Sequence, residues 1–213
     1  MPVDCNHREC AHRRLERLAT WPNAVTVVRT ASSVILSVLG ILSSSLTLLL
    51  AGLAVYWIGD IADGGLARAM RRETRIGATL DIVSDRACAV VFYLGLVSIR
   101  PDVLIPVVVY LFSFVVVDLI LSLGFWRWPL SSPNYFYLAD RRIWAWNWSK
   151  PAKAANSAVF VLALIWLPLP WLNLTVALLL LAVKIISLIR LAGLPSSPGQ
   201  DCAYHLRTIS PVA

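Results

Sequence analysis

The chain has 213 residues, of which 58% are hydrophobic and only 15% are charged. Soluble domains use about 45 to 50% apolar residues, so this composition excludes an ordinary soluble protein and indicates one integral membrane domain. The net charge of +7 does not indicate a nucleic-acid partner, because basic residues beside apolar segments are typical of cytoplasmic loops next to anionic lipid.

Residues 1–22 combine arginines with a few apolar side chains in an amphipathic pattern, which suits a cytoplasmic tail with a short helix on the lipid headgroups. We expect this interfacial helix to end at Pro22. Cysteines and histidines of both tails could hold a structural metal, but their spacing matches no zinc motif and solvated tails are the simpler interpretation. They are Cys5, His7, Cys10, His12, Cys202 and His205.

Six apolar segments follow, and we assign each of them to a membrane-spanning helix. The prediction is an all-α integral membrane protein in which residues 23–193 form one six-span domain and residues 194–213 form a flexible tail. The expected spans are 24–42, 46–61, a third that ends near residue 99, 103–125, 152–167 and 171–191.

Basic residues indicate which side of the membrane the loops occupy. Nearly all loop cations lie in the N-terminal tail, in the loop 68–75 and in the link 126–153, whereas the opposite side has only Arg100. Because cytoplasmic loops are enriched in lysine and arginine, we expect both termini to face the cytoplasm from a cell (inner) membrane.

Four aspartates lie where the second and third spans approach that cytoplasmic side. In helices, Asp60 and Asp63 would be about 60° apart and Asp81 and Asp85 about 40° apart, so each pair faces one way. A carboxylate inside a bilayer costs roughly 2.5 to 3.5 kcal/mol on insertion scales, and Arg68 alone cannot compensate four of them. Mg²⁺ or Mn²⁺ binds carboxylate oxygens and leaves positions open for phosphate, so we predict two such ions here.

The residues around these aspartates form a pattern with eight fixed positions between Asp60 and Asp85. It reads D-x2-D-G-x2-A-R-x8-G-x3-D-x3-D and resembles the signature of the CDP-alcohol phosphotransferase (CDP-alcohol phosphatidyltransferase) family at every position. The resemblance implies metal-dependent transfer of a substituted phosphate from a CDP-linked donor, usually CDP-diacylglycerol, to an alcohol, with release of CMP. It also implies a role in phospholipid biosynthesis and a homodimer.

By this resemblance the four aspartates would hold the two divalent ions, and Asp85 would double as the general base that takes the proton of the acceptor hydroxyl. Gly64 and Ala67 would leave room for the cytidine and its ribose. Arg68 would bind donor phosphate, and Gly77 would allow a close approach from the opposite wall.

The motif does not identify the acceptor alcohol. Residues 22–29, PNAVTVVR, resemble the start of the first span in the branch of the family that transfers to glycerol 3-phosphate, which is therefore the leading acceptor. Inositol phosphate, phosphatidylglycerol and serine are the alternatives. A phosphorylated acceptor would need cations outside the motif, and those on the correct side are Arg29, Arg141, Arg142, Lys150 and Lys153.

Two more charges, Asp118 and Lys184, lie about two turns inside the fourth and sixth spans. They could form an ion pair that fixes helix packing, or they could line a polar cavity. Arg86 would point about 100° away from its neighbour Asp85 and is equally suited to a structural role. Because intramembrane acidic residues also make ion pathways, an ion-coupled transporter is the alternative from another functional class.

Overall fold

Helices form almost all of the described part of the chain. The computed structural model describes residues 7, 9–11, 17–70, 72–167 and 169–195. Within these ranges there is no β-strand, and one isolated β-bridge joins Cys10 to Leu130. The all-α fold expected from the sequence is confirmed.

In the described ranges, five helical segments are long and apolar enough to cross a membrane, so the chain has the character of a multi-pass membrane protein. They are α1 (Trp21–Leu42), α2 (Leu46–Ala69), α3 (Arg75–Ile99), a fourth segment (Pro101–Arg127) and α9 (Pro170–Ala192). The fourth segment is irregular and consists of η2 (Pro101–Val103), α4 (Leu104–Leu111), η3 (Phe112–Val117), α5 (Asp118–Leu123) and η4 (Gly124–Arg127).

The predicted span 152–167 is helical, but it is not among these five segments. It consists of α7 (Lys150–Ala154), a π-helical turn η6 (Ala155–Val159) and α8 (Phe160–Trp166). A helix needs about 20 residues to cross a 30 Å hydrocarbon core, and this run is shorter and has lysines at its first and fourth positions. Five spans are therefore supported, and the sixth is not confirmed.

Hydroxyl side chains cap the starts of the first three helices. Thr20, Ser45 and Thr74 each accept a backbone N–H from the first turn of α1, α2 and α3. The cap at Thr20 starts α1 at Trp21, so Pro22 belongs to the first span instead of ending an interfacial helix. Residues 17–20 are not helical, and most of the proposed interfacial helix lies outside the described residues.

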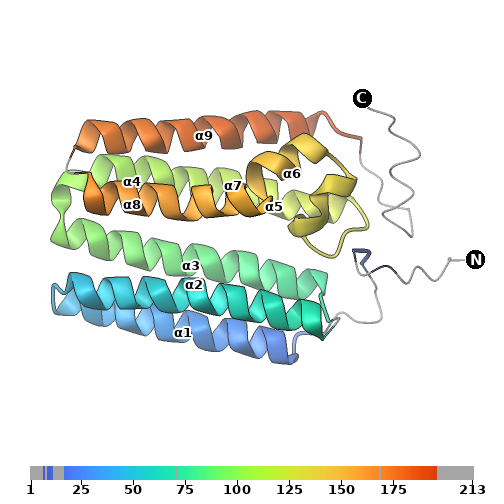
Figure 1. Cartoon of the computed structure of the whole chain (residues 1–213), viewed down its shortest axis with the longest axis horizontal. Coiled ribbons are helices and arrows are strands. Elements are labelled where there is room, and N and C mark those ends of the chain that lie inside the picture. Colours follow the sequence, from blue (N-terminus) through green and yellow to red (C-terminus); the bar gives the residue numbers. More distant parts are fainter. Residues whose placement is uncertain (1–6, 8, 12–16, 71, 168, 196–213) are drawn as a thin grey trace, which may run out of the picture.

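The helices form a bundle with two halves (Figure 1). One half contains α1, α2 and α3, and the other contains the fourth segment, α7–α8 and α9. The start of α1 and the end of α9 lie at the same end of the bundle. Within the first half, Gly52 brings α2 close to α1, because a Cβ there would lie 2.6 Å from the Ser37 hydroxyl oxygen.

The link between the fourth segment and α7 is folded and packs at the end of the bundle where α1 begins. It contains a 3₁₀ turn, η5 (Pro133–Leu138), and α6 (Arg141–Asn147). Leu130, Phe136 and Ile143 are fully buried in a core that also contains Phe125 of the fourth segment. This packing holds the polar residues of the link against the helices that carry the aspartates.

Candidate active site

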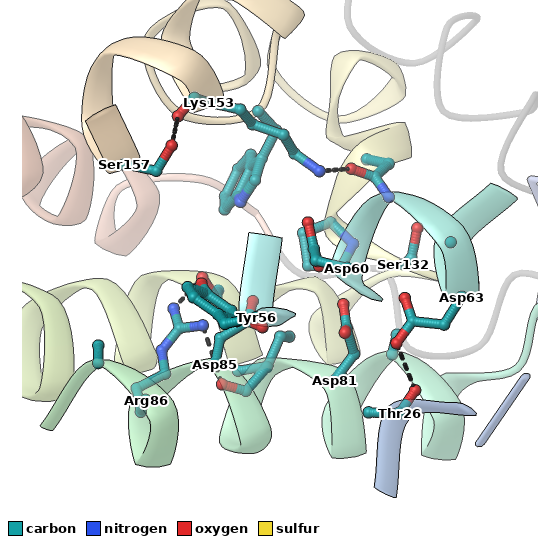
Figure 2. Close-up of a pocket in the computed structure, with 18 of the residues that line it drawn as sticks. Thr26, Tyr56, Asp60, Asp63, Asp81, Asp85, Arg86, Ser132, Lys153 and Ser157 are labelled. Atoms are coloured by element: carbon teal, nitrogen blue, oxygen red, sulfur yellow. Dashed lines mark hydrogen bonds between the residues drawn. The ribbon is translucent and has the colours of Figure 1, made fainter. Parts of the chain in front are cut away.

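A cavity of about 250 Å³ lies between the two halves of the bundle (Figure 2). Its walls come from α1, α2 and α3 on one side, and from the fourth segment, the link, α7, η6, α8 and α9 on the other. All eight fixed positions of the sequence pattern line it. They are Asp60, Asp63, Gly64, Ala67, Arg68, Gly77, Asp81 and Asp85.

The four aspartates, which we call the acidic group, face one another across the α2–α3 interface. One oxygen each from Asp60, Asp63 and Asp81 lie within 4.8 Å of one another, a spacing that suits ligands of a single cation. Asp63 is buried, whereas the side chains of Asp60 and Asp81 are 44% and 37% exposed. Figure 2 shows Asp81 and Asp85 rising from α3 toward the two aspartates of α2.

Arg29 of α1 is in ion-pair contact with the acidic group. Its guanidinium lies 2.7 Å from Asp63, 3.0 Å from Asp85 and 3.7 Å from Asp60. It also bonds to Asp81. Arg29 is 4% exposed and does not line the cavity, although it was expected among the acceptor-binding cations.

Two small contacts position Arg29 and Asp63. Gly59 of α2 leaves room for the arginine stem, because a Cβ at that position would lie 2.6 Å from both Cβ and Cδ of Arg29. Thr26, one turn before Arg29, donates its hydroxyl to the Asp63 carboxylate at 2.7 Å. The segment 22–29 that resembled the family thus reaches the acidic group from α1.

The donor set fits a divalent cation. One guanidinium balances one of four carboxylates, so the acidic group keeps an excess of negative charge in a largely apolar bundle. Hard cations such as Mg²⁺ and Mn²⁺ prefer carboxylate oxygens, and the partly exposed Asp60 and Asp81 give them access from the cavity.

The two glycines of the pattern differ in what surrounds them. A Cβ at Gly64 would lie 3.2 Å from Nη1 of Arg68, so this glycine keeps the cavity open beside the arginine. A Cβ at Gly77 would lie 2.9 Å from Asn23 Oδ1 and from Thr74 Oγ1. Gly77 therefore allows the start of α3 to pack closely against α1 as well as lining the cavity.

The predicted acceptor-binding cations do not gather in one place. Lys153 lines the cavity and donates to the Asn134 side chain at 2.5 Å, reaching in from the half of the bundle opposite α3 (Figure 2). Arg141, Arg142 and Lys150 do not line it. Among these residues, Lys153 is thus the one placed to contact a bound substrate.

A second set of charges lines the cavity where the fourth segment and α9 approach α3. We call Arg86, Asp118 and Lys184 the inner charged cluster; all three side chains are buried. Lys184 lies 2.7 Å from Asp118, and Arg86 bonds to the same carboxylate. Asn147 accepts a hydrogen bond from Lys184 at 2.8 Å. Both roles left open by the sequence, ion pairing and cavity lining, therefore apply to Asp118 and Lys184.

Several polar residues of the cavity were not identified from the sequence. They include Tyr56, Ser132, Asn134, Asn147, Asn156 and Ser157. Asn156 and Ser157 interrupt an otherwise apolar segment and lie in the π-helical turn η6, an irregularity that is frequent at functional sites. That interruption could have identified Asn156 and Ser157 from the sequence. In the link, by contrast, polar residues are common, so nothing in the sequence distinguished Asn134 from its neighbours.

Comparison with protein families supports the chemistry suggested by the cavity. The family model described as CDP-alcohol phosphatidyltransferase matches residues 19–189, which extend from the cap of α1 into the last turns of α9. No curated protein and no solved structure gave a match to the chain.

Proposed function

Because the chain belongs to the CDP-alcohol phosphatidyltransferase family, whose members transfer a phosphatidyl group from a CDP-alcohol, we propose CDP-diacylglycerol as its donor and glycerol 3-phosphate as its leading acceptor. The observation that carries this proposal is the meeting of three carboxylate oxygens within 4.8 Å on a cavity that all eight pattern positions line. Inositol phosphate, phosphatidylglycerol and serine remain the alternative acceptors.

Asp60, Asp63, Asp81 and Asp85 would hold two divalent ions, Mg²⁺ or Mn²⁺. When bound, such ions would neutralise charge on the donor pyrophosphate and on the CMP that leaves. Arg68 would bind donor phosphate from the last turn of α2, beside the space that Gly64 leaves open.

Asp85 is proposed as the general base. It is the least exposed of the partners of Arg29 after Asp63, and it follows Asp81 by one turn of α3, toward the inner charged cluster. The acceptor oxygen would form a bond to the phosphorus that carries diacylglycerol, and the bond from that phosphorus to the oxygen of CMP would break. Asp85 would take the hydroxyl proton.

The setting of the reaction follows the same reasoning. The site would face the cytoplasm of an inner membrane, with both termini on that side and six segments crossing the bilayer, because the loop cations gather there. This proposal agrees with α1 beginning and α9 ending at one end of the bundle. A homodimer is expected from the family.

Release of CMP tests this function. Purified protein in mixed micelles would be given CDP-diacylglycerol, Mn²⁺ and each candidate acceptor, and CMP would be measured. We expect release with the wild type and loss of it in Asp85→Asn. Asp102→Asn is the matched control, because Asp102 is exposed in the turn after α3 and does not line the cavity. Ion conduction without CMP release from any acceptor would instead indicate a transporter.

A further inference from the structure

We propose, on the basis of the proposed function, that the inner charged cluster binds an anionic group of the acceptor, so that the acceptor is a small alcohol carrying a phosphate or a carboxylate. The cluster contains two cations, Arg86 and Lys184, and one anion, Asp118, and it lines the same cavity as the acidic group. The following observations separate such a subsite from a purely structural ion pair.

The cluster carries an excess positive charge. Both oxygens of Asp118 are engaged, one with Lys184 and the other with Arg86, yet a single carboxylate balances only one of the two cations. The neighbouring Asp85 is in ion-pair contact with Arg29, and no described ion pair joins it to Arg86. A buried cation in excess of its contacting carboxylates is costly, and an anion bound from the cavity would lower that cost.

Donors in the cluster remain available. Arg86 is buried, and its Nε has no hydrogen-bond partner among the described residues. Lys184 has three donor hydrogens, and the described contacts give it two acceptors, Asp118 and Asn147. Buried donors are normally satisfied, and an oxygen of a phosphate or carboxylate in the cavity would accept the remaining hydrogen of the Lys184 ammonium.

The packing holds these donors in place before a ligand arrives. The Arg86 guanidinium lies 4.5 Å from the ring centroid of Phe114, and it donates to the Ile82 carbonyl at 3.0 Å and to the Ser122 hydroxyl at 3.2 Å. Phe114 belongs to the π-helical turn η3, which leads directly into Asp118. A fixed cationic group of this kind binds an anion with little loss of side-chain entropy.

The location suits an acceptor. Arg86 directly follows Asp85 in α3, and both line the same cavity although they point about 100° apart around the helix. A short molecule whose anionic group rests on the inner charged cluster would therefore hold its hydroxyl near the proposed base. The opposite sign of the acidic group would attract cations and the donor to the other part of the cavity.

The test compares anionic with uncharged acceptors, and the wild type with variants that lack the charge of Lys184. Lys184→Met would leave a neutral pair of Arg86 and Asp118, and Lys184→Gln would do so while keeping a hydrogen-bond donor. KM and kcat would be measured for glycerol 3-phosphate and for serine, which separates a phosphate from a carboxylate ligand, and for uncharged glycerol. We expect the wild type to use an anionic acceptor, and both variants to raise its KM about 10- to 100-fold, the effect of losing one charge-assisted hydrogen bond.

A double variant that restores the net charge of the cluster separates an anion-binding role from a structural one. Asp118→Asn combined with Lys184→Met returns the single positive charge of the cluster, and we expect it to recover part of the lost affinity. Arg190→Met, which removes an ion-paired cation of the same helix outside the cavity, is the matched control and should leave KM unchanged. A structural ion pair would instead be damaged further by the second substitution.

Binding of CMP in the presence of Mn²⁺ separates the two proposals. If wild type and variants bind CMP but KM for the acceptor is unchanged in the Lys184 variants, or if glycerol is used as well as glycerol 3-phosphate and serine, the inference is overturned and the proposed function stands. If the wild type binds no CMP and releases none, the proposed function is wrong and the inference falls with it.

Discussion

The acidic group and the inner charged cluster line one cavity but are built in opposite ways. The acidic group has four carboxylates around one guanidinium, and two of its members are more than a third exposed. The inner charged cluster has two cations around one carboxylate, and all three are buried. The difference suits the two proposals: the exposed, strongly negative group would hold exchangeable cations, and the buried cluster with its one excess cation would hold the acceptor.

Removing the metal should have the largest effect. A chelator should abolish CMP release, and Mn²⁺ should restore it, because the acidic group would otherwise repel the donor pyrophosphate. Asp81→Asn removes one carboxylate of the group while keeping its size, and we expect a loss of about 100-fold or more in kcat/KM. Full activity of Asp81→Asn in the presence of chelator would show that the acidic group needs no cation.

Arg29→Gln should weaken the fold but favour the metal. It removes the buried cation that contacts all four aspartates, and breaking buried pairs costs about 3 to 5 kcal/mol, with the lower end expected here because Asp60 and Asp81 are partly exposed. We expect a lower Tm in chelator and a larger upward shift of Tm with Mn²⁺ than in the wild type. Equal Mn²⁺ shifts would contradict competition between Arg29 and the metal for the same carboxylates.

Gly59→Ala should have a smaller effect that depends on Arg29. The new Cβ would lie 2.6 Å from Cβ and Cδ of Arg29, and we expect a destabilisation of about 1 to 3 kcal/mol from overpacking. Gly65→Ala is the matched control in the same helix, because nothing lies within 4 Å of a Cβ there. If both substitutions lower Tm equally, the cause is a change in the helix itself and not a clash with Arg29.

Lys153→Met should have the smallest effect. Lys153 is exposed and its ammonium donates to Asn134, so we expect a rise in substrate KM of less than about 10-fold and no change in Tm. The same measurement of acceptor KM and kcat that tests the Lys184 variants would test this variant. An effect on the acceptor larger than that of Lys184→Met would move the acceptor subsite to Lys153 and Asn134.

The sequence predicted the acidic group because its information is local. Asp60 and Asp63, and likewise Asp81 and Asp85, are spaced three or four residues apart, so helical geometry alone places each pair on one face. The two pairs then meet in one cavity because α2 and α3 are antiparallel neighbours, with one pair near the end of α2 and the other near the start of α3. The family resemblance supplied the expected chemistry and now agrees with the family match over residues 19–189.

Contacts between distant segments were harder to predict. Nothing in the spacing of Arg29 indicated that it would contact all four aspartates, since that contact depends on the close packing of α1 against Gly59. Asp118 and Lys184 could be identified as buried charges, but their spacing did not indicate that Arg86 of α3 would bond to the same carboxylate. The predicted span 152–167 was not confirmed as a membrane span, because its helical run is short and is interrupted by the π-helical turn η6.

Binding of Mn²⁺ to the purified protein, counted by electron paramagnetic resonance with and without CMP, tests the central claim most directly. We expect wild type to bind two ions per chain with an affinity that rises when CMP is present, and Asp63→Asn to lose this binding. A wild-type protein that binds no Mn²⁺ at millimolar concentration, with or without CMP, would contradict the assignment of the acidic group as a metal and donor site.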